Sequence, residues 1–433
     1  MNQHTRNATL LSILFMGLGH IYNKRIVKGI IFAVIELFFI IVVLPMEIKN
    51  IRGLITLGDI PQRMIKGKIV QGDHSVFMLI YGIVAIIIAF IFIILYLINI
   101  SDARNGGKLR DKGRNSKNIE GDVFSALDKR FPYILLTPAV VFTLFLTVLP
   151  LLFGILIAFT DYSSPNHIPP RALVNWVGLQ NFINLFKISS LKTTFLGVLS
   201  WTIIWAIIAT LTTFFVGLIF AVIINSSAVK IKKFWRTIYI IPWAMPSFIS
   251  VLMMRNMFNG EFGPINKYLS ALGVPAIGWF SDPTWAKITC VLVNIWFGFP
   301  YYMALMSGIL SGISKDMYEA AEIEGASPFQ QFRNITLPMV MFATAPLLIM
   351  AFSFNFNNFN LIYLLTNGNP VNPDYTYAGA TDILLSWLYK LTLEQSQFQL
   401  ASVVSILIFL VVATISAINF LNTRAFKEED MIQ

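Results

Sequence analysis

The sequence predicts an all-α integral membrane protein, because it is apolar, poor in charge and divided into long hydrophobic runs. Of its 433 residues, 56% are apolar and only 12% are charged, and the mean hydropathy is +0.70. Soluble domains carry about 25% charged residues, which excludes an ordinary soluble enzyme. A helix needs about 20 mostly apolar residues to cross a bilayer. About eight stretches meet that need, at 28–45, 76–100, 133–160, 194–226, 236–257, 284–311, 338–366 and 398–422.

A shorter apolar stretch precedes the first of these spans, from Ala8 to Leu18. It is too short to cross alone, so we expect an interfacial or re-entrant segment whose side of the membrane the sequence leaves open. Glu36 lies inside the first span. A carboxylate is costly at that depth, so we expect it to pair with a basic group or to bond a neighbouring helix.

Lysine and arginine residues in the loops predict the orientation. Residues 101–131 contain eight of them and residues 227–236 contain four, so we expect both loops and the C-terminal tail in the cytoplasm. Alternation then places 161–193, 258–283 and 367–397 outside. The loop at 46–75 fits this scheme less well, because it carries five basic residues on the side predicted to be external.

One boundary divides the predicted spans into two domains. The stretch 105–115 is rich in glycine and basic residues, cannot bury itself and predicts a solvated linker. We therefore expect an N-terminal membrane-anchor hairpin with a basic cytoplasmic linker over 1–131, and a six-span core over 132–433.

Several kinds of chemistry are excluded by the residues that the sequence lacks. The chain has one cysteine and four scattered histidines, which offer no metal site: Cys290, His4, His20, His74 and His167. No catalytic residue and no cofactor is predicted. No GxxxxGK[ST] loop is present, so the chain has no ATP site of its own. The core spans hold almost no acidic residue, which argues against an ion-coupled carrier and a membrane-embedded acid–base enzyme. The basic residues lie between spans, which argues against nucleic-acid binding.

Polar residues gather in the span at 338–366. Four asparagines alternate with four phenylalanines over residues 352–360. In one continuous helix, Asn355 and Asn358 share a face with Phe354. Amides donate and accept hydrogen bonds and ring faces stack on C–H surfaces, so this wall suits a neutral polyhydroxyl ligand. Hydrogen bonding between helices is the alternative.

A second aromatic wall lies at 296–302, in the span at 284–311. Gly298 and Pro300 weaken a helix there and predict a break that lines a cavity. An ordinary aromatic packing belt is the alternative.

Two short helices are predicted in the loop at 312–338. The first covers 315–324 and ends at Gly325, which can adopt the positive φ of a helix terminus. The second begins with Ser327 as N-cap and Pro328 as first residue. Its apolar face consists of Phe329, Phe332 and Ile335. The pair is typical of a docking knob, although it could instead pack on its own bundle.

This loop resembles the EAA loop of binding-protein-dependent ABC importer permeases. The matching residues are Glu319, Ala320, Ala321, Gly325, Ile335, Leu337 and Pro338. In that family the loop forms a coupling helix that sits in a cleft of the ATPase subunit, so the resemblance implies ATPase coupling for these seven residues.

The core from about 133 to 422 resembles the larger permease subunit of maltose/maltodextrin importers. The resemblance implies a sugar site at Phe297, Gly298, Tyr301, Phe354, Asn355 and Asn358. Two positions depart from that subfamily, since Ala351 stands where a serine is expected and Phe297 replaces a leucine.

The resemblance also implies a function and a set of partners. The protein would be a transport subunit with a six-helix ABC importer permease core in a bacterial cell membrane, importing maltose/maltodextrin-type oligosaccharides. It would work with a second homologous permease, two cytoplasmic ATPase subunits that hydrolyse ATP, and an extracellular sugar-binding protein. The alternatives are another oligosaccharide, such as a galacto-oligosaccharide or cyclodextrin, and an ion-coupled sugar carrier.

Overall fold

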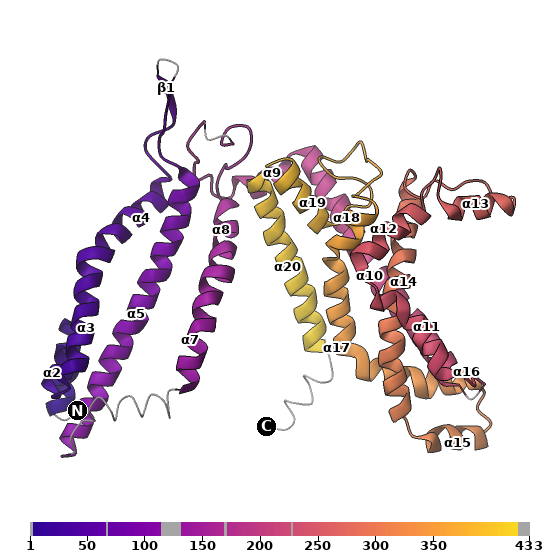
Figure 1. The fold of residues 1–433 in the computed structure, drawn as a ribbon, viewed down its shortest axis with the longest axis horizontal. Coiled ribbons are helices and arrows are strands. Elements are labelled where there is room, and N and C mark those ends of the chain that lie inside the picture. The colour runs from indigo at the N-terminus through magenta and orange to yellow at the C-terminus, as the bar shows by residue number, and fades with distance from the viewer. Residues whose placement is uncertain (1–2, 66–67, 114–130, 169–170, 227, 423–433) are drawn as a thin grey trace. The chain divides into compact units, whose positions relative to one another are not determined.

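The computed structural model describes residues 3–65, 68–113, 131–168, 171–226 and 228–422 (Figure 1). The chain divides into two compact units, Met1–Gly178 and Leu179–Gln433. Apart from one short hairpin, β1 (Arg63–Ile65) and β2 (Lys68–Val70), the regular structure described is helical. The predicted all-α class is confirmed.

Seven described helices are long and apolar enough to cross a membrane. An eighth span results when α11 and α12, which are bent by 92° at a short break, are counted together. These helices correspond to the eight predicted spans. The first is longer than predicted, because it continues from Ile26 to Thr56.

The first unit contains nine described helical segments. Their bounds are α1 (Gln3–Leu14), α2 (Leu18–Tyr22), α3 (Ile26–Phe38), the π-helical η1 (Phe39–Val43), α4 (Leu44–Thr56), α5 (Ser75–Asp111), α7 (Phe131–Thr143), the π-helical η2 (Leu144–Val148) and α8 (Leu149–Ile157). The long α5 is the centre of the unit, because α1, α2 and α4 all pack against it.

The apolar stretch at 8–18 forms a helix, a sharp turn and the start of a second helix. Gly17 has a φ of +91°, and a Cβ at this position would overlap the carbonyl oxygen of Gly29. Only glycine fits there, because it lacks a Cβ and tolerates positive φ. Glu36 accepts a hydrogen bond from the backbone N–H of Met16. The bond reaches the turn between α1 and α2, whereas the sequence predicted a basic group or a neighbouring helix as the partner.

The predicted linker at 105–115 is wrong for its first seven residues. Helix α5 continues to Asp111, and both Gly106 and Gly107 are buried. A Cβ on Gly107 would lie 2.8 Å from the Cα of Thr5, so the missing side chains allow α1 to approach α5 closely. Residues 114–130 lie outside the described residues. The domain boundary between residues 131 and 132 remains a prediction.

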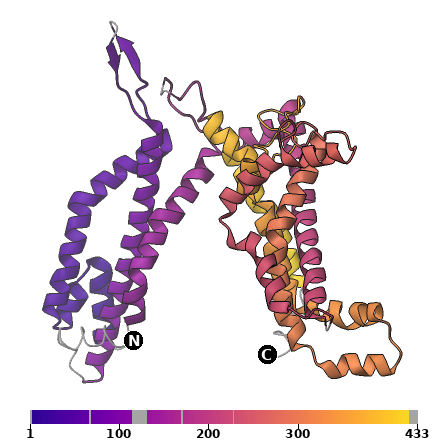
Figure 2. The same cartoon turned by 45° about the vertical axis from the view of Figure 1, so that its right-hand side comes forward.

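The second unit contains the remaining helices. Their bounds are α9 (Gln180–Lys187), α10 (Ser189–Asn225), α11 (Lys232–Ala244), α12 (Ser247–Met257), α13 (Pro264–Ala271), α14 (Pro283–Gly312), α15 (Lys315–Ile323), α16 (Pro328–Gln331), η3 (Phe332–Thr336), α17 (Leu337–Phe356), α18 (Phe359–Leu365), α19 (Leu384–Tyr389), η4 (Lys390–Glu394) and α20 (Phe398–Asn422). Within this unit, α15 and α16 lie at the opposite end from α13, α18 and α19 (Figures 1 and 2).

Helix α10 organises the core of the second unit by packing against α14 and α17. Trp205 is fully buried, and its indole N–H donates to the backbone carbonyl of Asn355 at 2.9 Å. Trp201 donates in the same way to the carbonyl of Thr381 at 3.1 Å. These bonds satisfy the polar atom of each buried ring and join α10 to segments more than 100 residues away in sequence.

Two predicted helix shapes are wrong. Helix α14 runs without a break through Gly298 and Pro300. A Cβ on Gly298 would lie 2.7 Å from Cγ2 of Thr213, so this glycine permits α10 and α14 to pack closely. The span at 338–366 is broken instead, because α17 ends at Phe356 and α18 begins at Phe359. Asn355 and Asn358 therefore do not share one helical face.

Candidate functional site

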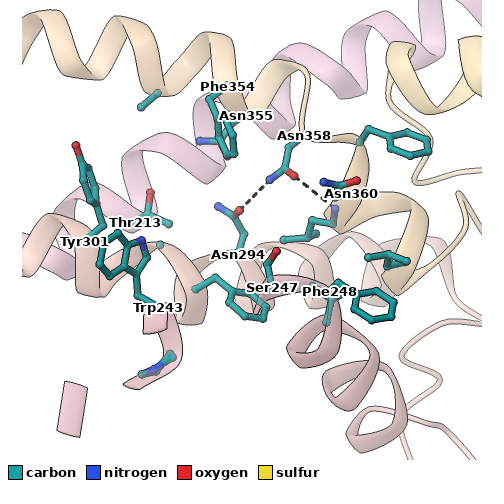
Figure 3. Close-up of a pocket in the computed structure, with 18 of the residues that line it drawn as sticks. Thr213, Trp243, Ser247, Phe248, Asn294, Tyr301, Phe354, Asn355, Asn358 and Asn360 are labelled. Carbon is teal, nitrogen blue, oxygen red and sulfur yellow. Dashed lines mark hydrogen bonds between the residues drawn. The ribbon is translucent and has the colours of Figure 1, made fainter. Parts of the chain in front are cut away.

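A pocket of about 1070 Å³ lies within the second unit. Residues of α10, α11, α12, α14, α17 and α18 line it, and the breaks between α11 and α12 and between α17 and α18 open onto it (Figure 3). Irregular backbone at membrane depth is tolerated where it lines a cavity or is buried in protein.

The structure brings all six residues of the predicted sugar site to this pocket. Phe297, Gly298 and Tyr301 come from α14, and Phe354, Asn355 and Asn358 come from the end of α17 and the break after it. The six residues come from two segments about 60 positions apart in sequence. Their roles in binding remain a prediction.

Several aromatic side chains at the pocket are exposed. Phe354 is 70% exposed and Tyr301 is 41% exposed. The ring of Trp243, at the end of α11, lies 6.3 Å from that of Tyr301 and is tilted by 38°. These rings are available to a ligand. Phe299 and Tyr302, which lie on α14 with Tyr301, are buried instead.

The two predicted amides are bonded to the protein itself. Asn355 is buried, and its Nδ2 donates to Oγ1 of Thr210 at 3.0 Å. Asn358 donates from Nδ2 to Oδ1 of Asn294 at 3.4 Å, and its own Oδ1 accepts from the backbone N–H of Leu361 (Figure 3). Asparagine readily leaves a helix for such local bonds, which explains why α18 begins here. The amides are thus fixed in orientation at the wall.

Sequence reasoning missed several residues that line the pocket. They are Thr213, Trp243, Ser247, Phe248 and Asn294, whereas Asn360 belongs to the predicted asparagine run but not to the six predicted sugar-site residues. A signal existed for Asn294, because it lies three and four residues before Phe297 and Gly298 on the same helical face. A signal also existed for Trp243, because Pro242 and Pro246 flank it inside a predicted span and favour a broken helix.

The pocket is uncharged over the part of its lining that the structure describes. Amide, hydroxyl and aromatic groups provide its polar and stacking surfaces. Such a wall is suited to a neutral, hydroxyl-rich ligand and poorly suited to an ion, because a desolvated ion needs an opposite charge. Within the described residues, no three His, Cys, Asp or Glu side chains are placed to hold a metal ion.

The loop between α14 and α17 forms the first short helix that its sequence predicts. The second is not separate, because the helix that begins at Pro328 continues through η3 into α17 as one span. Helix α15 ends before Gly325, which has a φ of +80°. Ser327 caps α16, and Gln330 completes the capping box by accepting from the backbone N–H of Ser327 at 2.7 Å. Ile323 and Phe329 expose 88% and 68% of their surfaces. The two helices, which we call the knob, lie at one end of the unit (Figure 2) and expose these apolar side chains among acidic ones.

The seven predicted coupling residues belong to this knob or to its connection with α17. Glu319, Ala320, Gly325 and Pro338 are exposed, and Ala321, Ile335 and Leu337 are partly buried. The Tyr318 hydroxyl lies 2.8 Å from Oγ1 of Thr336, which joins α15 to the start of the α17 span. The knob is therefore connected directly to a helix that lines the pocket.

Comparison with known proteins identifies the class. Residues 213–425 match the family described as binding-protein-dependent transport system inner membrane component. Two relatives come from Bacillus subtilis (strain 168). The maltodextrin transport system permease protein MdxF is 39% identical and aligns over 100% of both chains. The galactooligosaccharides transport system permease protein GanP is also 39% identical, over 99% of this chain and 100% of its own.

Two further proteins extend the comparison. The maltose/maltodextrin transport system permease protein MalF of Escherichia coli (strain K12) is 41% identical over 57% of this chain and 49% of its own. A bacterial ABC transporter involved in the import of the acidic polysaccharide alginate has a TM-score of 0.57 at 21% identity, covering 69% of this chain and 97% of its own. At that identity the second likeness concerns the fold alone.

The fold and the matches define a multi-pass permease subunit of an ABC importer. The pocket residues and the knob lie within the matched range, or directly beside it. The chain belongs to the binding-protein-dependent transport system inner membrane component family.

Proposed function

We propose that this permease subunit imports maltose/maltodextrin-type oligosaccharides. The observation that carries the proposal is an uncharged pocket with exposed rings and oriented amides, in a chain about 40% identical over its whole length to maltodextrin permeases. Tyr301 and Phe354 would stack on the C–H faces of the sugar. The lone pairs of Asn355 and Asn358 that the protein does not use would accept from sugar hydroxyls.

A galacto-oligosaccharide is the second candidate substrate. GanP is as similar to this chain as MdxF is. The uncharged pocket does not separate the two sugars, because both are neutral and rich in hydroxyl groups.

The proposed partners are a second homologous permease, two cytoplasmic ATPase subunits and an extracellular sugar-binding protein. The exposed knob of α15 and α16 supports ATPase docking, because exposed apolar side chains on capped helices are suited to a protein cleft. The proposed orientation places the knob, the basic loops at 101–131 and 227–236 and the C-terminus in the cytoplasm. The proposed domains are an anchor at 1–131 and a permease core at 132–433.

The knob and the pocket would be coupled through α17. ATP binding and hydrolysis in the partner subunits would move the knob, and α17 would transmit that movement to Phe354 and the break after it. Access to the pocket would then alternate as a population shift between two states, driven by their different affinities for the partners and the sugar.

Uptake of labelled maltotriose tests the substrate. Cells with and without this gene are compared, with maltodextrin, galacto-oligosaccharide and glucose as competitors. Loss of uptake that only malto-oligosaccharides compete for supports the proposal. Maltotriose uptake that does not depend on the gene contradicts the first candidate. Labelled galacto-oligosaccharide is then measured in the same cells, and its loss without the gene selects the second candidate.

The variant Gly325→Pro tests the coupling knob. Proline fixes φ near −65°, so it cannot adopt the +80° found at this turn. We expect uptake to be abolished and the ATPase subunits to be lost on co-purification, while the chain stays in the membrane. Gly273→Pro is a matched control, because Gly273 also has a φ of +80° and open space around it but lies beside α13. Wild-type uptake in Gly325→Pro would contradict the assignment.

A further inference from the structure

The pocket has two chemically distinct ends. Trp243 and Tyr301 lie at one end, whereas Phe248 and Asn360 lie at the other, and the hydrogen-bonded pair Asn294 and Asn358 lies between them (Figure 3). We call the end with Phe248, Phe359, Asn360 and Tyr363 the second end. None of these four residues is among the six of the predicted sugar site.

The bend between α11 and α12 lies between the two ends. The two helices meet at 92°, and Trp243 and Phe248, which flank the bend, face different parts of the pocket. Phe248 is 58% exposed, and Ser247 is exposed beside it.

Helix α18 supplies the opposite wall of the second end. The rings of Phe359 and Tyr363 stack at 4.9 Å with an angle of 17° between their planes. Tyr389 of α19 packs against both rings, at 4.9 Å from each. These mutual contacts fix the orientation of the rings, so they form an ordered aromatic wall.

The polar groups of the second end differ from those at the centre of the pocket. The amides of Asn355 and Asn358 are held by protein hydrogen bonds. Asn360 is exposed, and no hydrogen bond within the described part of the chain holds its amide. This amide can therefore offer its donors and its acceptor to a ligand.

We propose that the second end is a separate subsite for the glycosyl units of longer oligosaccharides. It rests on the proposed function, in which the Tyr301 and Phe354 end binds the first units. At about 1070 Å³ the pocket lies at the top of the roughly 300–1,000 Å³ range typical of small-molecule sites, so it has room for more than a disaccharide. The second end supplies flat rings and an unengaged amide without a charge, and it is thereby the part of the permease that distinguishes long chains from short ones.

Chain-length dependence of uptake tests this subsite. The variants Phe248→Ala and Asn360→Ala are compared with wild type for labelled maltose and labelled maltohexaose. We expect maltohexaose uptake to fall about 2- to 10-fold, the range of one lost ring contact, with maltose uptake unchanged. Tyr301→Ala should lower both. Phe262→Ala should change neither, because Phe262 is 61% exposed but lies outside the pocket.

Equal losses for maltose and maltohexaose in both variants would overturn the subsite. Failure of either variant to co-purify with the partner subunits would also count against that residue, since it would then pack on a partner. If the wild type imports no malto-oligosaccharide, the proposed substrate fails instead. The same variants are then measured with short and long galacto-oligosaccharides, where an equal loss again overturns the subsite.

Discussion

Two broken helices solve the same physical problem in opposite ways. The turn at 15–17, between α1 and α2, is filled by protein, and we call it the closed break. The turn at 357–358, between α17 and α18, lines the pocket, and we call it the open break. Each leaves backbone groups without helical partners inside an apolar unit, where an unsatisfied group is costly.

The closed break satisfies its backbone with side chains from α3 and α5. Glu36 accepts from the N–H of Met16, and Asn99 accepts from the N–H of Gly17 at 3.2 Å. The Tyr96 hydroxyl donates to the carbonyl of Ile13 at 2.9 Å. All three side chains are occupied in holding the turn, so the polar residues of this region serve its structure.

The open break uses its own asparagines and leaves neighbouring groups accessible. Asn358 caps α18, and Asn355 bonds to Thr210 behind the wall. The side chains of Phe354 and Asn360 are exposed and do not hold the break. The comparison teaches that polar residues in a span indicate a binding site when the bonds within the protein leave some of their donors or acceptors, or neighbouring side chains, accessible.

Gly17→Ala should have the largest effect. A Cβ would overlap the Gly29 carbonyl oxygen, and positive φ alone costs about 1–2 kcal/mol in a residue with a Cβ. We expect a loss of more than about 2 kcal/mol, measured as a lower thermal unfolding temperature of the purified protein. Gly113→Ala is the control, because Gly113 has a φ of +68° with nothing nearby. Equal decreases in unfolding temperature in the two variants would contradict the close packing described for Gly17.

Asn99→Leu should have the next largest effect. The substitution removes the acceptor for Gly17 and the donor to the Ser12 carbonyl, which lies 3.3 Å away. Leaving buried backbone groups unsatisfied costs about 1–3 kcal/mol. Thermal unfolding should show that loss, while uptake per assembled complex stays normal. Asn105→Leu, at an exposed position of the same helix, should leave stability unchanged.

At the open break, Phe354→Ala should lower sugar uptake and leave stability nearly unchanged, the reverse of Asn99→Leu. The ring is 70% exposed, so stability should change by less than about 0.5 kcal/mol. Sugar uptake should fall about 2- to 10-fold, because a stacking surface is lost. Phe342→Ala is the matched control, since Phe342 lies on the same helix, is 62% exposed and is outside the pocket. A stability loss without an uptake defect would make the two breaks alike.

Asp73→Asn should have the smallest effect and leave both breaks intact. The backbone N–H groups of Asp59 and Ile60 hold the pKa of the Asp73 carboxyl below its usual value. Its contribution is present above the unfolded pKa of about 3.9 and is lost as pH falls through the lower folded pKa. We expect a cost below about 1 kcal/mol near pH 7 that shrinks in acid. A cost that grows in acid would contradict this sign.

The predicted linker at 105–115 shows where hydropathy gives a wrong prediction. Residues 105–111 look too polar and too rich in glycine to be buried, yet they continue α5 and pack against α1. Asp111 accepts from the backbone N–H groups of His4 and Thr5, both at 3.0 Å. A partner more than 100 residues away makes the polar stretch helical, and no local pattern contains that information.

The sequence by itself determined the helical class, the eight spans, and where the first helix of the knob ends and the second begins. These features depend on neighbouring residues: the length of an apolar run, the capping residues and the glycine at 325. They can therefore be predicted from short stretches of sequence. The sequence also identified six residues that line one pocket. Only the tertiary structure decided where α17 breaks, that α14 does not, and that the bend of α11 and α12 completes the pocket. Those features depend on contacts between distant segments, such as Gly298 with Thr213 and Asn358 with Asn294.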